Sequence, residues 1–202
     1  MARPLTVIVY SDYICPFCFI ASKRVDRLEQ EMGVGVEWRG LEIHPETPPQ
    51  GVPTPPHLRR YLEDEGGSVQ GLAQEDEIEL QVPSLMSNSH LALLAGEFAR
   101  GQGKFPEYHQ AVFRAYFQEG QDIGDRRVLE GLLKGLGLDS GGLEAYLARG
   151  DGEKVLEANR HEALHRGIGG VPTFLIGAFQ IEGVQAYPVL MRAVEKSRGQ
   201  AT

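Results

Sequence analysis

The chain has 202 residues, of which 42% are hydrophobic and 24% charged, and its formal net charge at pH 7 is −8. This composition is typical of a soluble globular protein with one domain, or with one domain that carries a large insertion. The acidic balance argues against a nucleic-acid partner, because phosphate binding requires a basic surface. No apolar run approaches the roughly 20 residues of a membrane-spanning helix, so we expect no membrane partner.

The first apolar run covers residues 5–10 and is too short for the hydrophobic part of a secretion signal. No cleavage site of small residues follows it. The β-branched residues Val7, Ile8 and Val9 predict a buried strand instead. We therefore expect a mature cytoplasmic protein.

A Cys-Pro-Phe-Cys segment follows at residues 15–18 and contains the only two cysteines of the chain. Pro16 suits the first turn of a helix, and apolar residues then recur at helical spacing as far as Gly33. Residues 34–43 have the pattern of a second strand. A strand, a short helical crossover and a strand predict a parallel pair.

Six of the twelve prolines lie within residues 44–56, which indicates a loop and a boundary. Beyond it, four apolar stripes at helical spacing, separated by glycines, predict a helical insertion of roughly 100 residues. Residues 60–87 are acidic and rich in Gly and Gln, and predict a lid or mobile loop. A helix over residues 153–166 and a hairpin over 173–181 follow, and a last helix closes the chain.

Two cysteines three positions apart at the start of a helix are typical of a redox pair. The free N–H groups of the first turn and the helix macrodipole favour a thiolate there. We expect Cys15 to be exposed and nucleophilic, and Cys18, one turn later, to resolve the mixed disulfide. A structural disulfide and a pair of inert buried thiols are the alternatives. A closed zinc site is disfavoured because the chain has no second cysteine pair.

A second motif, Gly-Gly-Val-Pro-Thr at residues 169–173, directly precedes the predicted hairpin. By itself its proline is best explained as an ordinary trans residue at a strand edge, since only about 5–6% of X–Pro bonds are cis. Together with the Cys-Pro-Phe-Cys segment and the helices between them, however, this motif resembles the DsbA family of thioredoxin-like proteins. Residues 11–18 and 113–123 are similar to its cytoplasmic FrnE-like branch.

The resemblance implies an α/β thioredoxin-like fold with an inserted all-helical domain. Residues 1–45 and 150–202 would form the thioredoxin-like domain, and residues 46–149 the helical domain. The implied activity is thiol–disulfide exchange with thiol- or disulfide-containing proteins and peptides, or with small thiols such as glutathione. No metal and no organic cofactor is expected, and the oligomeric state stays open.

The resemblance also implies roles for particular residues. Cys15 and Cys18 would be the catalytic pair, and a cis Pro172 would lie against them. Val171 would offer its backbone to a peptide substrate, strand to strand. We also expect substrate contacts from three other residues of the two motifs, namely Pro16, Phe17 and Thr173.

One position departs from the pattern of thioredoxin-like proteins. Many of them carry a buried acid six residues before the first cysteine, and here Val9 stands at that position. Proton transfer therefore requires water or another group, such as Asp12. A helix cap or a turn former is an equally good interpretation of Asp12.

Three other functions compete with thiol–disulfide exchange. His161-Glu162-Ala163-Leu164-His165 matches a zinc-site pattern, but no third ligand follows at the required spacing, which favours a solvated helix face. The remaining histidines are scattered and predict no site. A glutathione-dependent isomerase or transferase of the 2-hydroxychromene-2-carboxylate isomerase or kappa type would need only one Ser or Cys, and keeping both cysteines argues against it. A peptide-binding chaperone is a further alternative.

Overall fold

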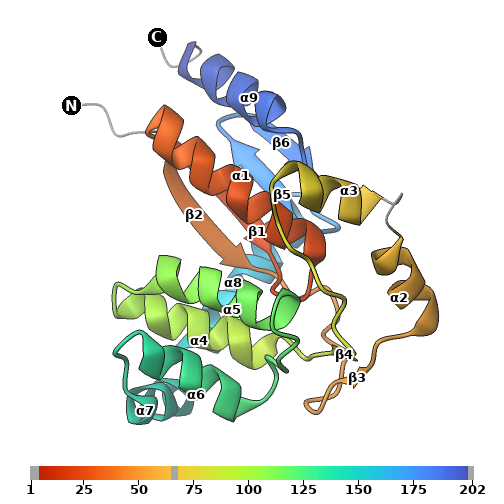
Figure 1. Cartoon of the computed structure of the whole chain (residues 1–202). Coiled ribbons are helices and arrows are strands. Elements are labelled where there is room, and N and C mark those ends of the chain that lie inside the picture. The colour runs from red at the N-terminus through yellow and green to blue at the C-terminus, as the bar shows by residue number, and fades with distance from the viewer. Residues whose placement is uncertain (1–4, 65–67, 200–202) are drawn as a thin grey trace.

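The computed structural model describes residues 5–64 and 68–199, and Figure 1 shows their arrangement. The central sheet has four strands in the order β2–β1–β5–β6. Its strands are β1 (Thr6–Ser11), β2 (Gly35–Gly40), β5 (Thr173–Ile176) and β6 (Phe179–Glu182). β1 runs parallel to β2, whereas β5 pairs antiparallel with both β1 and β6. The predicted parallel pair and the predicted hairpin are both confirmed.

The described helices surround this sheet. They are α1 (Pro16–Met32), α2 (Pro56–Glu63), α3 (Ser68–Glu75), α4 (His90–Gly101), α5 (Phe105–Phe117), α6 (Arg126–Gly135), α7 (Ser140–Arg149), α8 (Asp151–His165) and α9 (Tyr187–Gly199). No helix among the described residues is long and apolar enough to span a lipid bilayer.

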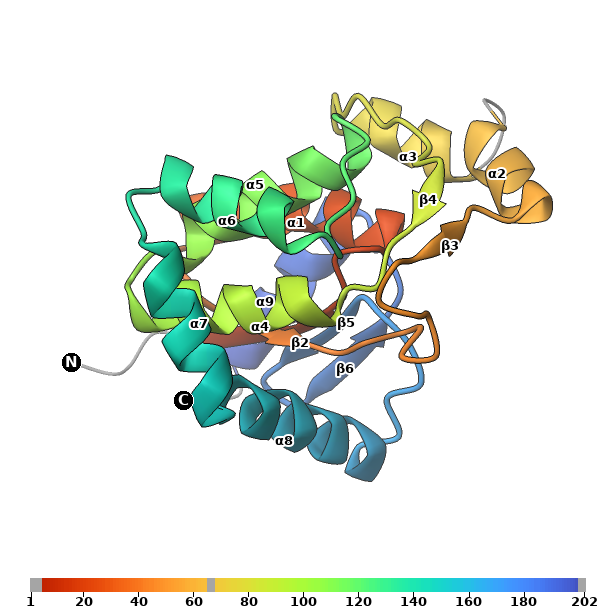
Figure 2. The same ribbon diagram turned by 90° about the horizontal axis from the view of Figure 1, so that it is seen from below.

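The sheet is covered on both faces because alternate residues of a strand point to opposite sides. Val7 and Val9 of β1 pack into one core with α1 and α9. Ile8 and Tyr10 belong to a smaller core that includes Ala163 of α8. Figure 2 shows α8 on the opposite side of the sheet from α1 and α9. This layering is that of an α/β fold.

Between β2 and β5 the chain is helical apart from one short sheet. That sheet pairs β3 (Val52–Pro53) with β4 (Leu85–Met86), and the sequence did not predict it. Helices α4–α7 gather below α1 in Figure 1, whereas α2, β3 and β4 lie to the right of them. The helical insertion of the predicted fold is therefore present.

Residues 60–87 were predicted to form a lid or mobile loop. The loop prediction is wrong for residues 60–63 and 68–75, which are helical, and the lid stays a prediction. The end of α2 and all of α3 lie in it. Leu62, Val69 and Ala73 are buried in the largest apolar core of the protein. Burial of these side chains stabilises helices that the local composition disfavours, because most helix stability comes from tertiary packing.

Helix α1 joins the two main cores. Cys18, Phe19 and Ile20 pack with the helical insertion, whereas Val25 and Leu28 pack against the sheet. The core therefore runs across the predicted boundary at residue 45. The division into a domain of residues 1–45 and 150–202 and a domain of residues 46–149 is based on the sequence, and it stays a prediction.

Candidate active site

The cysteine pair lies where the N-terminus of α1 meets the loop before β5. Cys15 is the N-cap residue of α1, with φ −91° and ψ 115°, and Pro16 is the first helical residue. The backbone N–H groups of Phe17 and Cys18 donate toward the Cys15 sulfur and lower the pKa of its thiol. The N–H of Cys18 also donates to the carbonyl oxygen of Cys15 at 3.1 Å, and N–H groups of a first helical turn favour an anion at the N-cap.

The two thiols differ in acidity. Both cysteines are unpaired, and the Cys18 thiol hydrogen-bonds to the Cys15 sulfur. This hydrogen bond is the main cause that lowers the pKa of Cys15, and it outweighs the opposite effect of burial. Burial raises the pKa of Cys18 well above its usual value. The geometry therefore favours a Cys15 thiolate beside a protonated Cys18.

Cys15 was predicted to be exposed, and the structure shows that it is not. Only 4% of the residue is accessible, because the first turn of α1 packs into the core of the helical insertion. Its sulfur faces the loop before β5, where it lies 3.7 Å from the carbonyl oxygen of Val171. Pro16, Phe17 and Val171 are only partly buried, so the accessible surface near the sulfur belongs to them.

The loop before β5 has the backbone geometry that the resemblance implied. The Val171–Pro172 peptide bond is cis, and Pro172 is buried. Thr173, by contrast, is fully buried, and its hydroxyl donates to the carbonyl oxygen of Gly170 at 2.8 Å. The Thr173 side chain therefore holds the loop. Contrary to our expectation, this side chain is not available to a substrate.

Asp12 has the geometry of a turn former, and its role in proton transfer stays a prediction. Its buried carboxylate accepts hydrogen bonds from the backbone N–H groups of Ile43 at 2.8 Å and Ile14 at 3.4 Å, which makes it a turn former. Its backbone carbonyl accepts from the N–H of Cys15, and its own N–H donates toward the Cys18 sulfur. Burial raises the pKa of the Asp12 carboxyl to about 6, so it also titrates near the cysteines.

The sequence analysis missed Ser11. This residue is 4% accessible and lowers the pKa of the Cys18 thiol, although its hydroxyl makes no hydrogen bond of normal geometry within the described residues. The signal was present in strand alternation, because Ser11 lies two residues after Val9 and therefore on the same face of β1. Val9 itself packs in the sheet core, and its side chain has no ionisable group that could transfer a proton.

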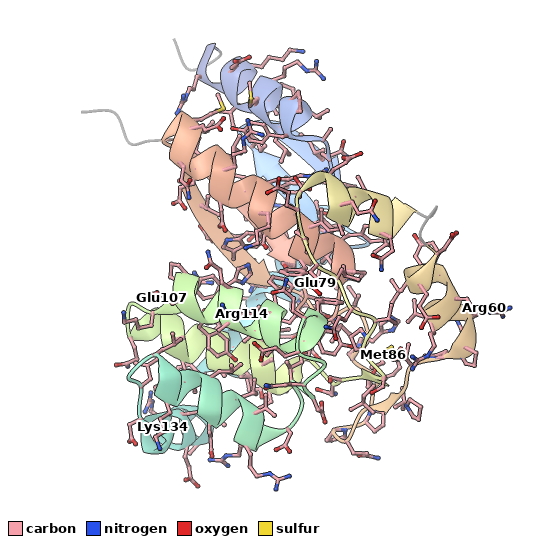
Figure 3. The ribbon with its side chains drawn as sticks, in the orientation of Figure 1. Arg60, Glu79, Met86, Glu107, Arg114 and Lys134 are labelled. Atoms are coloured by element: carbon pink, nitrogen blue, oxygen red, sulfur yellow. The ribbon has the colours of Figure 1, made fainter. Side chains whose placement is uncertain are left out.

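An apolar cavity of about 100 Å³ opens beside the cysteine pair. Its walls include Ile14 and Pro16, on either side of Cys15, and Ile43. Leu58, Met86 and Phe117 of the insertion are also among them. Figure 3 labels Met86 on the side of the molecule that carries α2 and β3. No Asp, Glu, Lys or Arg of the described chain lines this cavity.

The His-Glu-x-x-His segment lies on the solvated face of α8. His161 is 63% exposed at its side chain and pairs with Glu157 at 2.8 Å. Glu162 pairs with Arg166 at 2.8 Å and also with Arg39. Within residues 5–64 and 68–199, no group of three or more His, Cys, Asp and Glu residues could hold a metal ion.

Two relatives are similar in sequence over most of their length. The uncharacterized protein YwbO of Bacillus subtilis is 33% identical over 189 residues, which cover 92% of this chain and 94% of YwbO. A 2-hydroxychromene-2-carboxylate isomerase of Sphingobium xenophagum is 25% identical over 178 residues, which cover 85% of this chain and 88% of the isomerase.

Two solved structures are similar in fold. A probable DsbA oxidoreductase from Streptomyces coelicolor superposes with a TM-score of 0.83 at 23% identity, covering 98% of this chain and 92% of that one. The cytosolic disulfide reductase DsbM from Pseudomonas aeruginosa, solved with GSH, gives a TM-score of 0.70 at 22% identity, covering 98% and 97%. The model of the DSBA-like thioredoxin domain matches residues 6–195, and the chain therefore belongs to that family.

Proposed function

We propose that this protein is a thiol–disulfide oxidoreductase that acts through Cys15 and Cys18. The observation that carries the proposal is the geometry of the pair: two unpaired cysteines at the start of α1, with the Cys15 sulfur 3.7 Å from the Val171 carbonyl beside the cis Pro172. The pKa values agree with it, since the pKa is lowered at Cys15 and raised at Cys18. Thiol–disulfide exchange needs this asymmetry, because one sulfur must attack while the other keeps its proton until it resolves the intermediate. Assignment to the FrnE-like branch stays a prediction.

The exchange proceeds in two displacements. The Cys15 thiolate attacks one sulfur of a substrate disulfide, forms a mixed disulfide, and releases the other substrate sulfur as a thiolate. Cys18 then loses its proton and attacks the Cys15 sulfur, which releases the second substrate sulfur. The enzyme pair has lost two electrons and the substrate has gained them. Another thiol pair or glutathione returns the electrons, and the reverse sequence oxidises a substrate.

A peptide next to the reacting cysteine is the substrate that we favour. In this proposal Val171 offers its backbone to an extended chain, and Pro172 holds that loop against the cysteines. The cavity beside Pro16 suits an aliphatic side chain of the substrate, since its walls carry no Asp, Glu, Lys or Arg. For comparison, apolar cavities of about 150 Å³ in other proteins bind molecules of the size of benzene. Phe17, which is partly exposed, is the remaining proposed contact.

The alternative is a glutathione-dependent isomerase of the same family. The observation in its favour is the 25% identity to the isomerase of Sphingobium xenophagum. The GSH found with the DsbM structure also supports glutathione as a small-thiol partner under either proposal. We include a cytoplasmic location in the oxidoreductase proposal, because the reducing cytoplasm would return the cysteine pair to its dithiol form.

A redox titration separates the two proposals. The protein is equilibrated in buffers of graded reduced-to-oxidised glutathione ratio, and its free thiols are counted by alkylation and mass spectrometry. We expect a two-electron transition that disappears in Cys18→Ser, and we expect Cys18→Ser to accumulate a mixed disulfide with a peptide substrate. Ser22→Ala is the matched control on α1, since the Ser22 hydroxyl bonds only to the carbonyl of Phe19. Failure to form the Cys15–Cys18 disulfide at any ratio would contradict the oxidoreductase proposal and favour the isomerase.

A further inference from the structure

The buried carboxylate of Asp12 bonds to two residues that line the same cavity. Asp12 is 0% accessible, and its carboxylate accepts from the backbone N–H groups of Ile43 at 2.8 Å and Ile14 at 3.4 Å. Both residues line the apolar cavity of about 100 Å³ beside the cysteine pair. Ile14 lies in the turn before α1, whereas Ile43 follows β2. One carboxylate therefore fixes two separate segments of the cavity wall relative to each other.

Residues 42–44 lie beyond the end of β2, where strand pairing no longer fixes them. On the buried side this segment is held by the hydrogen bond from the Ile43 N–H to Asp12. On the partly exposed side the Glu42 carboxylate pairs with the His90 ring at 2.7 Å. Loss of the bond to Asp12 should therefore loosen this part of the wall without releasing it completely.

The hydroxyl groups in the walls of this cavity are bonded to the protein backbone. The Tyr116 hydroxyl donates to the carbonyl oxygen of Leu85 at 3.0 Å, and the Thr54 hydroxyl donates to that of Pro83 at 2.7 Å. A substrate side chain in the cavity would therefore gain mainly by burial of apolar surface. That gain depends on how closely the walls pack around the side chain, because a gap of less than one water molecule already forfeits dispersion contacts.

Asp12 also fixes the nucleophile, since its backbone carbonyl accepts from the N–H of Cys15 at 3.2 Å. The same residue thus sets the position of the reacting sulfur's backbone and of the cavity wall beside it. We propose that Asp12 is a positioning residue that makes the protein select substrates with an aliphatic side chain next to the reacting cysteine, by holding Ile43 and Ile14 in the wall of the cavity.

The inference rests on the proposed function and concerns its first displacement. Two short uncharged peptides serve as probes, with leucine on both sides of one cysteine in the first and glycine in the second. Each cysteine carries thionitrobenzoate as a mixed disulfide. The Cys15 thiolate attacks the peptide sulfur, a disulfide forms between protein and peptide, and thionitrobenzoate leaves as a coloured thiolate. Excess reduced protein makes this a single turnover, recorded in a stopped-flow instrument.

The dependence of the rate on protein concentration separates the affinity for the peptide from the limiting rate of attack. In the wild type we expect the leucine peptide to react roughly tenfold faster at low concentration, with the difference in affinity. The quantity compared between variants is the leucine-to-glycine ratio. This ratio cancels any change in the reactivity of the Cys15 thiolate, because both peptides react with the same sulfur.

Asp12→Asn keeps an acceptor for the local bond to Ile14, but its amide has no second oxygen for the N–H of Ile43. We expect the ratio to fall roughly fivefold, the effect of one hydrogen bond, through weaker binding of the leucine peptide. Asp12→Ser favours the same kind of turn and is too short to reach Ile43, so it should behave alike and serves if the Asn variant does not fold.

Ile43→Ala tests the route of the effect. If Asp12 acts through Ile43, Asp12→Asn should change the ratio little in the Ile43→Ala background. Asp125→Asn is the matched control, because the Asp125 carboxylate also accepts a backbone N–H, that of Arg127 at 2.8 Å, and Asp125 does not line the cavity. Its ratio should equal that of the wild type.

Several results would overturn the inference. They are equal rates for the two peptides in the wild type, a wild-type ratio in both Asp12 variants, multiplied effects in the double variant, or a fall that appears only in the limiting rate. The last result would mean that Asp12 acts on the chemistry and not on the cavity. A wild-type protein that releases thionitrobenzoate from neither peptide would instead contradict the proposed function itself.

Discussion

The start of α1 and the end of α8 each carry a short motif that can support catalysis, and the structure treats them in opposite ways. At the start of α1, two thiols are buried together and their pKa values move apart. On α8, His161 is largely exposed and Glu162 is held in ion pairs with Arg39 and Arg166. Water screens the second set of charges, so their mutual influence is weak. Each motif places its two like residues about one helical turn apart, and burial is what separates the two regions.

The largest expected effect is the loss of activity on removal of the nucleophile. Cys15→Ser should abolish disulfide reduction, measured with insulin, because a serine hydroxyl is not ionised at neutral pH. His161→Ala and His165→Ala, separately and together, should leave the rate unchanged. Full activity in Cys15→Ser would mean that the cysteine pair is not required for activity. A loss in the histidine variants would mean that the exposed motif on α8 contributes to it.

The next effect concerns Asp12 and the stability of the fold. Its pKa is raised by burial to about 6 in the folded state, against 3.8 for the free group. The folded protein therefore binds more protons than the unfolded chain between these values, so this group makes the free energy of unfolding fall as pH rises from about 4 to about 6. The full effect is about 3 kcal/mol. Urea denaturation at pH 4, 5, 6 and 7 should show a flatter dependence in Asp12→Asn than in the wild type.

A smaller effect should follow from removing the partner of the nucleophile. The thiol of Cys18 is the main cause that lowers the pKa of Cys15, so Cys18→Ala should raise that pKa. We expect the rate of Cys15 alkylation by iodoacetamide at pH 7 to fall several-fold, up to about tenfold. An unchanged pH profile of alkylation would mean that the N–H groups of the first turn stabilise the thiolate without Cys18.

The smallest effect is expected on α8. Glu162→Gln removes two ion pairs from a partly exposed position, and such pairs are worth about 0–1 kcal/mol each. Denaturation in low and high salt should show a small loss of stability that salt reduces further. A loss of several kcal/mol would show that this helix face is integral to the fold.

Local patterns were sufficient for the elements of the thioredoxin-like half. The β-branched run of β1, the proline that opens α1 and the hairpin over residues 173–181 are all local patterns, and each prediction is confirmed. The resemblance also placed a cis bond before Pro172, which the structure has. The segment from residue 60 to residue 87 was misjudged, because its helices depend on burial of Leu62 and Val69 against distant residues.

The sequence by itself determined the order of strands and helices in the thioredoxin-like half and the positions of the two cysteines at the start of a helix, because hydrophobic periodicity and turn residues act over a few neighbours. Only the tertiary structure decided the burial of Cys15, the burial of Thr173 with its hydroxyl bonded to Gly170, and the approach of the Cys15 sulfur to the Val171 carbonyl. These features arise where segments far apart in the chain pack together, and such contacts do not follow from the pattern of neighbouring residues.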